Sequence, residues 1–466
     1  MVWSRRRRSQ WRCTIAAEPS EDSEVGARSW VNRQVLAIAF SAFFADLGYQ
    51  AVVAGLPLLL VIDLHAGVVT FATATAIGYG GGAVASLIGG RLGDRYGHRR
   101  VSIAGNAFIP LLSLVGLVNV AWAAVAFFVA GWWARNLRSP PRRALLVRSV
   151  PSPGDTGRAF GLLHGLDVGG GMIAALAAAA LLGAGWSLPS VFLLTAVPLA
   201  VSTLVLACLV VEHPLPTTPR AAREPTQLAE TIPVQAAQQA MEVQAEAIQV
   251  QAAQQAAEEQ PTWENPPPPP ARRTRAGVLV ASALFGFSFY SVGFPVLTVS
   301  QHSHSMVSGI LVFALFSGVS GAVGFAVGAR RWDAVMTLGV GGFGLSALAS
   351  LAFGMAAYEN AGLAPLAVAA AVLGAGLGVM ETIEPTLIAA LTPSHRHGAG
   401  MGNLAAARSI GLFVGNMVMG VLYVQGVLYA YAYAAGAALL GSIVMFALGR
   451  GAGITIASGT TRKRKP

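Results

Sequence analysis

The stretch GRLGDRYGHRR, residues Gly90 to Arg100, separates two long apolar runs at residues 67–89 and 101–119. A link this short between two such runs predicts a hairpin of two antiparallel membrane helices. Its charged residues keep the link in water, and its glycines allow a tight reversal between the helix ends. The charged members are Arg91, Asp94, Arg95, Arg99 and Arg100, and the glycines are Gly90, Gly93 and Gly97.

The composition is typical of an integral membrane protein. Of the 466 residues, 54% are hydrophobic and 11% are charged, with a mean hydropathy of +0.59, whereas soluble domains carry about 25% charged residues. The net charge of +10 lies in the tails and in alternate links, which favours a membrane surface over nucleic acid as a partner. The two cysteines, Cys13 in a polar tail and Cys208 in an apolar run, form no disulfide framework or metal cluster.

Twelve apolar runs are long enough to cross a bilayer, which takes about 20 residues in a helix. They lie at residues 35–61, 67–89, 101–119, 121–139, 158–183, 188–211, 277–299, 306–328, 334–356, 363–391, 400–424 and 428–449. All 31 Lys and Arg residues fall in the tails, in the links after every second run, or inside helices near those links. By the positive-inside rule both termini are cytoplasmic and the number of spans is even. The predicted fold is therefore an all-α membrane protein with twelve transmembrane helices.

The runs divide into two sets of six, which predicts two bundles joined by a linker. We expect a cytoplasmic tail at 1–33, the first bundle at 34–211, a linker at 212–275, the second bundle at 276–450 and a basic tail at 451–466. The first tail has arginines but no apolar segment behind them, so we do not expect a signal peptide. The linker is rich in Ala, Gln and Pro, and is either a solvated tether or a docking site for a partner.

Similarity between the halves indicates an internal duplication. GRAFGLLHGLDVGG at 157–170 resembles GAGMGNLAAARSIG at 398–411, with glycines matched at three positions. This alignment places Asp167 opposite Arg408. Repeats of this kind are typical of transporters, in which the solute site lies near the membrane midplane between the repeats.

Several ionisable residues lie inside the predicted spans, where each costs at least about 2.5–3.5 kcal/mol. They are Asp46, Arg135, Arg138, Asp167, Glu381, Glu384 and Arg408. Such residues persist when they are paired or when they line a wet cavity. Asp46, near the middle of the first span, is predicted to be a proton or solute site, with a hydrogen bond to a neighbouring helix as the alternative.

Basic and acidic pairs occupy matching places in the fourth and tenth spans. Arg135 and Arg138 lie one turn apart; we expect Arg138 to extend to the lipid head groups, and the deeper Arg135 to bind a carboxylate of the protein or the solute. Glu381 and Glu384 mirror them, which predicts a charge pair between the halves that is either structural or broken during transport. A carboxylate beside an arginine stays ionised, whereas one left alone in a dry site takes up a proton more readily. Such a pair would couple transport to protons.

Asp167 and Arg408 have opposite charges at matched places of the repeat, so we expect them to form an ion pair between the bundles. The expected role of this pair is structural, with a proton relay as the alternative. His164, one turn before Asp167, is expected to hydrogen-bond it.

The twelve spans, the long central linker and GRLGDRYGHRR together resemble the major facilitator superfamily over residues 30–450. The signature loop of that family reads G-x-x-x-D-R-x-G-R-R, and it is matched here by Gly90, Asp94, Arg95, Gly97, Arg99 and Arg100. The resemblance implies that Asp94 contacts neighbouring helix ends across the two halves and helps to hold the outward-facing state, with Arg95 as its charge partner. The alternative is a solvated loop that only sets topology. In the second copy Gly328 stands in the place of Asp94, which predicts a one-sided gating contact.

The same resemblance implies a cavity lined by the first, fourth, seventh and tenth spans. The fifth span, GLDVGGGMIAAL at 165–176, lacks the proline of the family's drug–proton antiporters, which weakens the prediction of drug export. The sequence contains no phosphate-binding GxxxxGK[ST] loop, no zinc-ligand spacing and no catalytic triad spacing. We therefore expect neither a cofactor nor an enzyme activity.

These features predict a secondary active transporter of the plasma (inner) membrane. We expect a monomer in the lipid bilayer that moves a small organic solute by alternating access, coupled to protons, without binding nucleic acid. A multidrug or metabolite exporter and a uniporter are the alternatives within the same fold. A non-transporting membrane receptor or scaffold is the alternative from another class.

Overall fold

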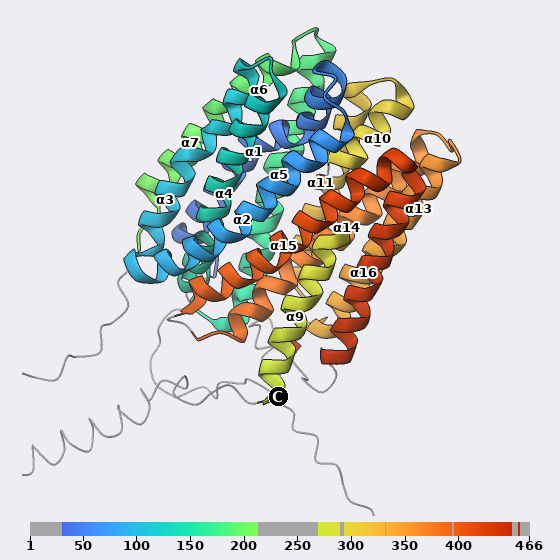
Figure 1. The fold of residues 1–466 in the computed structure, drawn as a ribbon. Helices are drawn as coiled ribbons and strands as arrows, with labels where there is room; N and C mark the ends of the chain where they lie inside the picture. The colour runs from blue at the N-terminus through green and yellow to red at the C-terminus, as the bar shows by residue number, and fades with distance from the viewer. Residues whose placement is uncertain are drawn as a thin grey trace, which may run out of the picture. The chain divides into compact units, whose positions relative to one another are not determined.

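The computed structural model describes residues 30–212, 269–288, 293–330, 332–393, 396–449 and 455–456. All of these residues belong to one compact unit. The predicted tails, apart from a few residues, and nearly all of the predicted linker lie outside the described residues. The fold is almost entirely helical (Figure 1).

The helices follow one another in two sets along the chain. The first set contains α1 (Arg33–Pro57), η1 (Leu58–Asp63), α2 (Val68–Tyr96), α3 (His98–Phe108), η2 (Ile109–Leu117), α4 (Ala121–Ser149), η3 (Pro153–Asp155), α5 (Thr156–Gly183), α6 (Leu188–Leu194) and α7 (Ala196–Leu209). The second set contains α9 (Pro269–Ser288), α10 (Gly293–Ser303), α11 (Met306–Gly328), α12 (Ala334–Met336), η4 (Thr337–Gly344), α13 (Leu345–Tyr358), α14 (Leu363–Ala390), α15 (His397–Gln425) and α16 (Val427–Gly449). Two short strands, β1 (Trp332–Asp333) and β2 (Thr455–Ile456), pair antiparallel.

Each of the twelve predicted spans coincides with one helix or with consecutive helical segments. Within the described ranges, ten helical segments are long and apolar enough to cross a membrane. The α4 helix fails this criterion because five arginines lie in its second half. The α9–α10 pair is interrupted by residues that the structure does not describe. The prediction of an all-α, multi-span membrane fold is confirmed.

Polar residues and glycines define the helix ends. The side chain of Asn32 accepts a hydrogen bond from the N–H of Val35 and so begins α1. Ser305 bonds the N–H of Ser308 in the same way at the start of α11. Gly97, with φ of +98°, ends α2 and starts α3, which is a conformation that favours glycine. The predicted tight reversal therefore occurs at Gly97.

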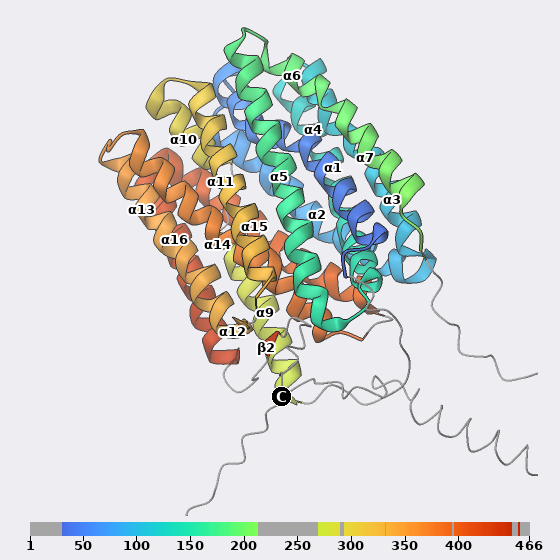
Figure 2. The ribbon, with the colours of Figure 1, turned by 180° about the vertical axis from the view of Figure 1, so that it is seen from behind.

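The two halves pack through small residues. In Figure 1 α2 lies beside α15, and in Figure 2 α5 lies beside α11. Gly90 of α2 is so close to Gly398 of α15 that a Cβ would overlap its carbonyl oxygen. On the other side Gly161 of α5 meets the backbone of Gly324 and Gly328 in α11. Close backbone approach of this kind is how membrane helices associate where the hydrophobic effect supplies no driving force.

The α4 helix is longer than predicted. We expected the fourth span to end at residue 139, with Arg142 and Arg143 in a cytoplasmic link, but the helix continues through Pro140 and Pro141 to Ser149. Proline removes the N–H that would bond the carbonyl four residues earlier. The carbonyl of Asn136, freed by Pro140, accepts the Ser86 hydroxyl of α2 at 3.3 Å. A neighbouring side chain thus replaces the lost bond, and the two later arginines are held inside the helix.

Candidate transport site between the halves

The signature loop contacts the opposite half through Asp94. Its carboxylate accepts hydrogen bonds from the backbone N–H groups of Gly398 at 3.1 Å and Ala399 at 2.8 Å. Both donors lie in the first turn of α15, where unpaired N–H groups and the helix dipole favour a negative charge. The bond therefore connects α2 of the first half to α15 of the second.

The expected partner of Asp94 is different in the structure. Arg95 is exposed and lies over the ring of Tyr96, 5.1 Å from its centroid. The imidazole of His98 lies 3.5 Å from Asp94 instead. The predicted pairing of Arg95 with Asp94 is wrong.

The rest of the loop is tied to the end of the first half. Glu212 accepts hydrogen bonds from the backbone N–H groups of His98 and Arg99, each at 2.8 Å. The side chain of Arg99 donates to the carbonyls of Val210, at 2.6 Å, and Ala207. Arg91 and Arg100 are exposed. Our sequence reasoning missed Glu212, although an isolated acid directly after the sixth span was a usable signal.

The second copy of the loop has no carboxylate at the corresponding place. Gly328 of α11 packs against Gly157 and Gly161 of α5. This side of the interface is therefore held by backbone packing at the position where the first copy uses Asp94.

One ion pair joins the halves deep in the bundle. A guanidinium nitrogen of Arg143 in α4 lies 2.7 Å from a carboxylate oxygen of Glu381 in α14. Glu381 also binds Arg408 of α15, and Arg408 in turn binds Glu384. The predicted charge pair between the fourth and tenth spans exists, but its basic member is Arg143 and not Arg135 or Arg138. This role of Arg143 could not be predicted from the sequence, because two prolines separate Arg143 from the predicted span.

Asp167 is paired within the first half. Its carboxylate lies 3.2 Å from Arg142 of α4, and the predicted pair with Arg408 is wrong. Arg142 reaches Asp167 because α4 continues past its prolines, whereas Arg408 is already held by two glutamates. The His164 side chain bonds Ser320 of α11 at 2.9 Å, so it bridges the halves and does not bond Asp167 as expected.

Asp46 lies beside these charges on α1 and is 2% exposed. One oxygen accepts a hydrogen bond from the amide of Gln50 at 3.0 Å. Its carboxyl group also interacts with that of Asp167 across the α1–α5 contact. Two of the predicted site residues are thus brought together, although they were assigned separate roles.

Arg135 and Arg138 differ in their surroundings. Arg135 is half-buried, donates to the Tyr49 hydroxyl at 3.3 Å, and lies over the rings of Tyr49 and Trp132. Arg138 is fully buried, and none of its three guanidinium nitrogens has a hydrogen-bond partner among the described residues. The prediction that Arg138 extends to the lipid head groups is wrong, because the side chain points into the bundle.

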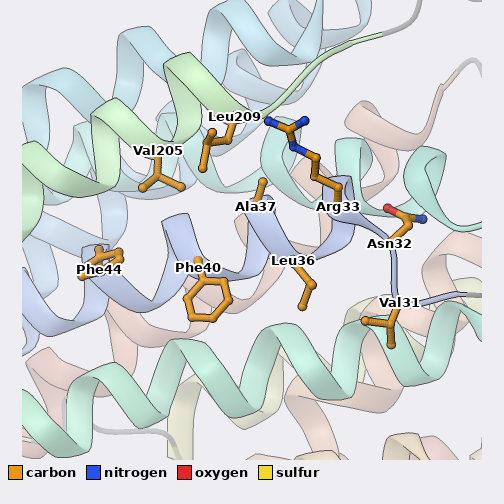
Figure 3. Close-up of a pocket in the computed structure, with 9 residues that line it drawn as sticks. All are labelled: Val31, Asn32, Arg33, Leu36, Ala37, Phe40, Phe44, Val205 and Leu209. Carbon is orange, nitrogen blue, oxygen red and sulfur yellow. The ribbon is translucent and has the colours of Figure 1, made fainter.

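An apolar groove of about 490 Å³ lies elsewhere, between α1 and α7 (Figure 3). Its lining residues are Val31, Asn32, Arg33, Leu36, Ala37, Phe40, Phe44, Val205 and Leu209. It shares no residue with the charged cluster, and Phe40 on its wall is 45% exposed. This groove therefore lies on the outer surface of the helices. No group of three or more potential metal ligands occurs in the parts of the chain that the structure describes.

Comparison with known proteins decides the family. The model of the Major Facilitator Superfamily matches residues 38–364. The chain belongs to the major facilitator superfamily. It is therefore a multi-pass membrane transporter and not an enzyme. No curated protein has a matching sequence.

Solved structures of the superfamily share the fold. The human organic anion transporter MFSD10 (TETRAN) is similar with a TM-score of 0.61 and 17% identity, over 89% of this chain and 99% of that one. The xylose transporter XylE from E. coli, in a partially occluded inward-open conformation, matches with a TM-score of 0.61 and 13% identity, over 89% and 98%. A D-xylose–proton symporter matches with a TM-score of 0.62 and 12% identity, over 91% and 99%. At these identities the similarity establishes the fold and leaves the solute open.

Proposed function

We propose that this transporter is a monomer in the plasma membrane that moves a small organic solute by alternating access and couples that movement to protons. The observation that carries the proposal is the ion pair of Arg143 with Glu381, which crosses between the halves within a cluster of buried charges. An ion pair between two bodies that move apart cannot persist in every state. When it breaks, Glu381 is left with Arg408 alone. The charge environment of the site then changes during the cycle, as coupling to a proton requires.

The proposed proton site is the carboxyl pair of Asp46 and Asp167. Asp167 is bound by Arg142 at 3.2 Å, whereas Asp46 accepts a neutral amide bond from Gln50. Two neighbouring carboxylates repel when both are ionised, so one proton held between them stabilises the pair. The charge of Arg135 also acts on Asp46, and a change in this interaction during the cycle would control release of the proton.

The proposed cytoplasmic gate is the contact of Asp94 with the first turn of α15. While Asp94 accepts the N–H groups of Gly398 and Ala399, the adjoining ends of α2 and α15 are held together. Opening of the cytoplasmic side requires these two charge-assisted bonds to break. Because the second copy has a glycine at this position, the other pair of helices separates without a comparable electrostatic cost.

Uptake into liposomes tests the coupling. The purified protein is reconstituted, and uptake of a solute found by thermal-shift screening is measured with and without an imposed pH gradient. We expect the gradient to accelerate uptake by the wild type. In Asp46→Asn the acceleration should disappear, while exchange of labelled for unlabelled solute continues. Arg91→Gln, at an exposed position outside the cluster, is the matched control. Wild-type uptake that ignores the gradient would show a uniporter and refute proton coupling.

A further inference from the structure

We propose that the solute is an organic anion whose carboxylate is bound by Arg138. The proposal rests on the function proposed above, since it assigns a substrate class to the same site. Arg138 is fully buried, yet its Nε, Nη1 and Nη2 atoms have no hydrogen-bond partner in the described part of the chain. A buried charge without a counter-charge is strongly unfavourable. Such a residue is best explained by a negative group that is bound during the transport cycle.

No carboxylate of the described residues forms an ion pair with Arg138, although the charge of Asp167 acts on it from a greater distance. Asp167 is bound by Arg142, and Glu384 is bound by Arg408. Glu381 is shared between Arg143 and Arg408. The cluster contains five arginines but only four carboxyl groups. The excess positive charge falls on the side of Arg138, which has Arg135 and Arg142 one turn away on the same helix and shares the negative charge of Asp167 with them.

The geometry of the group favours a carboxylate. A guanidinium presents N–H donors in a planar fork that matches the two oxygens of a carboxylate. All the nitrogens of Arg138 remain available for this interaction. A lysine ammonium group would supply the positive charge, but it could not donate two parallel hydrogen bonds to a carboxylate.

The neighbourhood favours an organic anion over a simple inorganic one. Trp132 is 5% exposed, and its indole N–H has no acceptor among the described residues. Its ring packs with Tyr49, Tyr79 and Phe128, at centroid distances of 6.0, 5.3 and 5.8 Å. Tyr49 connects this aromatic group to the arginines, since its hydroxyl accepts the bond from Arg135. The aromatic rings thus lie against Arg135, one turn before Arg138, and favour a small carboxylate with an apolar or aromatic body.

Three probes of nearly equal shape separate charge from size. Benzoate, benzamide and benzamidine are added in turn to the purified full chain. The shift of the unfolding temperature is measured for each of them. Succinate and sulfate are tested in the same way as further anions. We expect benzoate to stabilise the wild type while benzamide and benzamidine do not. Loss of a charged hydrogen bond should weaken benzoate binding in Arg138→Met by more than about tenfold. Stabilisation by benzamidine, or by no anion of the series, would overturn the proposal.

Stability without ligand gives an independent test. If Arg138 is kept for a ligand, Arg138→Met removes an unpaired buried charge and should unfold at the wild-type temperature or above. The matched control is Arg142→Met, one turn later on the same helix and equally buried. It should unfold at a lower temperature because it leaves Asp167 unpaired. A lower unfolding temperature for Arg138→Met would assign Arg138 a structural role and refute the proposal.

A conservative variant covers the case in which Arg138→Met does not fold. Arg138→Lys keeps the charge and should fold, but it should bind benzoate more weakly because the planar fork is lost. Equal benzoate affinity in Arg138→Lys and the wild type would refute the claim that the planar guanidinium binds the carboxylate. If an anion binds through Arg138 but its transport does not respond to a pH gradient, proton coupling is refuted. The proposed substrate class then still stands.

Discussion

At the scale of single residues, we propose that closure of the two halves at the α2–α15 contact depends on one carboxylate. Asp94 accepts two backbone N–H bonds from the first turn of α15. Both are charge-assisted, and such bonds are worth about 1.5–3 kcal/mol each. The loop around Asp94 is positioned separately, because Glu212 binds the first turn of α3. Glu212 therefore positions the loop, whereas Asp94 connects it to α15.

Replacement of Asp94 should open the cytoplasmic side. In Asp94→Ala both bonds to α15 are lost, so the open state should become more populated by at least about tenfold. The measurement is the distance between spin labels at Tyr96 and Met336, which are exposed residues of the two halves. Arg95→Ala serves as the control, because the Arg95 side chain lies over Tyr96 and does not bind α15. An unchanged distance distribution in Asp94→Ala would contradict the gating role of this residue.

At the scale of the element, α4 shows why the pairing of charges could not be predicted from the sequence. Arg142 and Arg143 follow two prolines, which normally end a helix at the preceding residue. The carbonyl freed by Pro140 is bonded by the hydroxyl of Ser86, which lies on another helix. The sequence thus indicated which spans carry buried charge, but the extension that decides the partners of Asp167 and Glu381 depends on tertiary contacts.

A double-mutant cycle tests this account of α4. Ser86→Ala should destabilise the protein by about 1 kcal/mol, because the carbonyl of Asn136 loses its donor. In the Pro140→Ala background the backbone N–H of residue 140 is restored, so Ser86→Ala should cost less there. The free energy of unfolding of the four variants is compared in the same detergent. Additive effects of the two substitutions would show that Ser86 does not compensate for Pro140.

At the scale of the whole molecule, the positions of the helices could be predicted from the local sequence. The contacts between the two halves could be predicted only in part. Run length and hydropathy predicted the multi-span helical fold, and GRLGDRYGHRR indicated the family. The repeat aligned Asp167 with Arg408, but an alignment of copies gives equivalent positions and not contacts. The actual partners are Arg142 for Asp167 and two glutamates for Arg408. The unpaired state of Arg138 became visible only when all its neighbours were placed.

We propose that the two halves alternate around the charged cluster, and paired distance measurements on one protein can detect this movement. Spin labels at Tyr96 and Met336 report one end, and labels at Trp186 and Tyr358, also exposed, report the other; Cys13 and Cys208 are first replaced by serine. Distances are measured at two pH values, with and without benzoate. We predict that one distance lengthens when the other shortens. Two distances that stay fixed, or that change in the same direction, would contradict alternating access in this transporter.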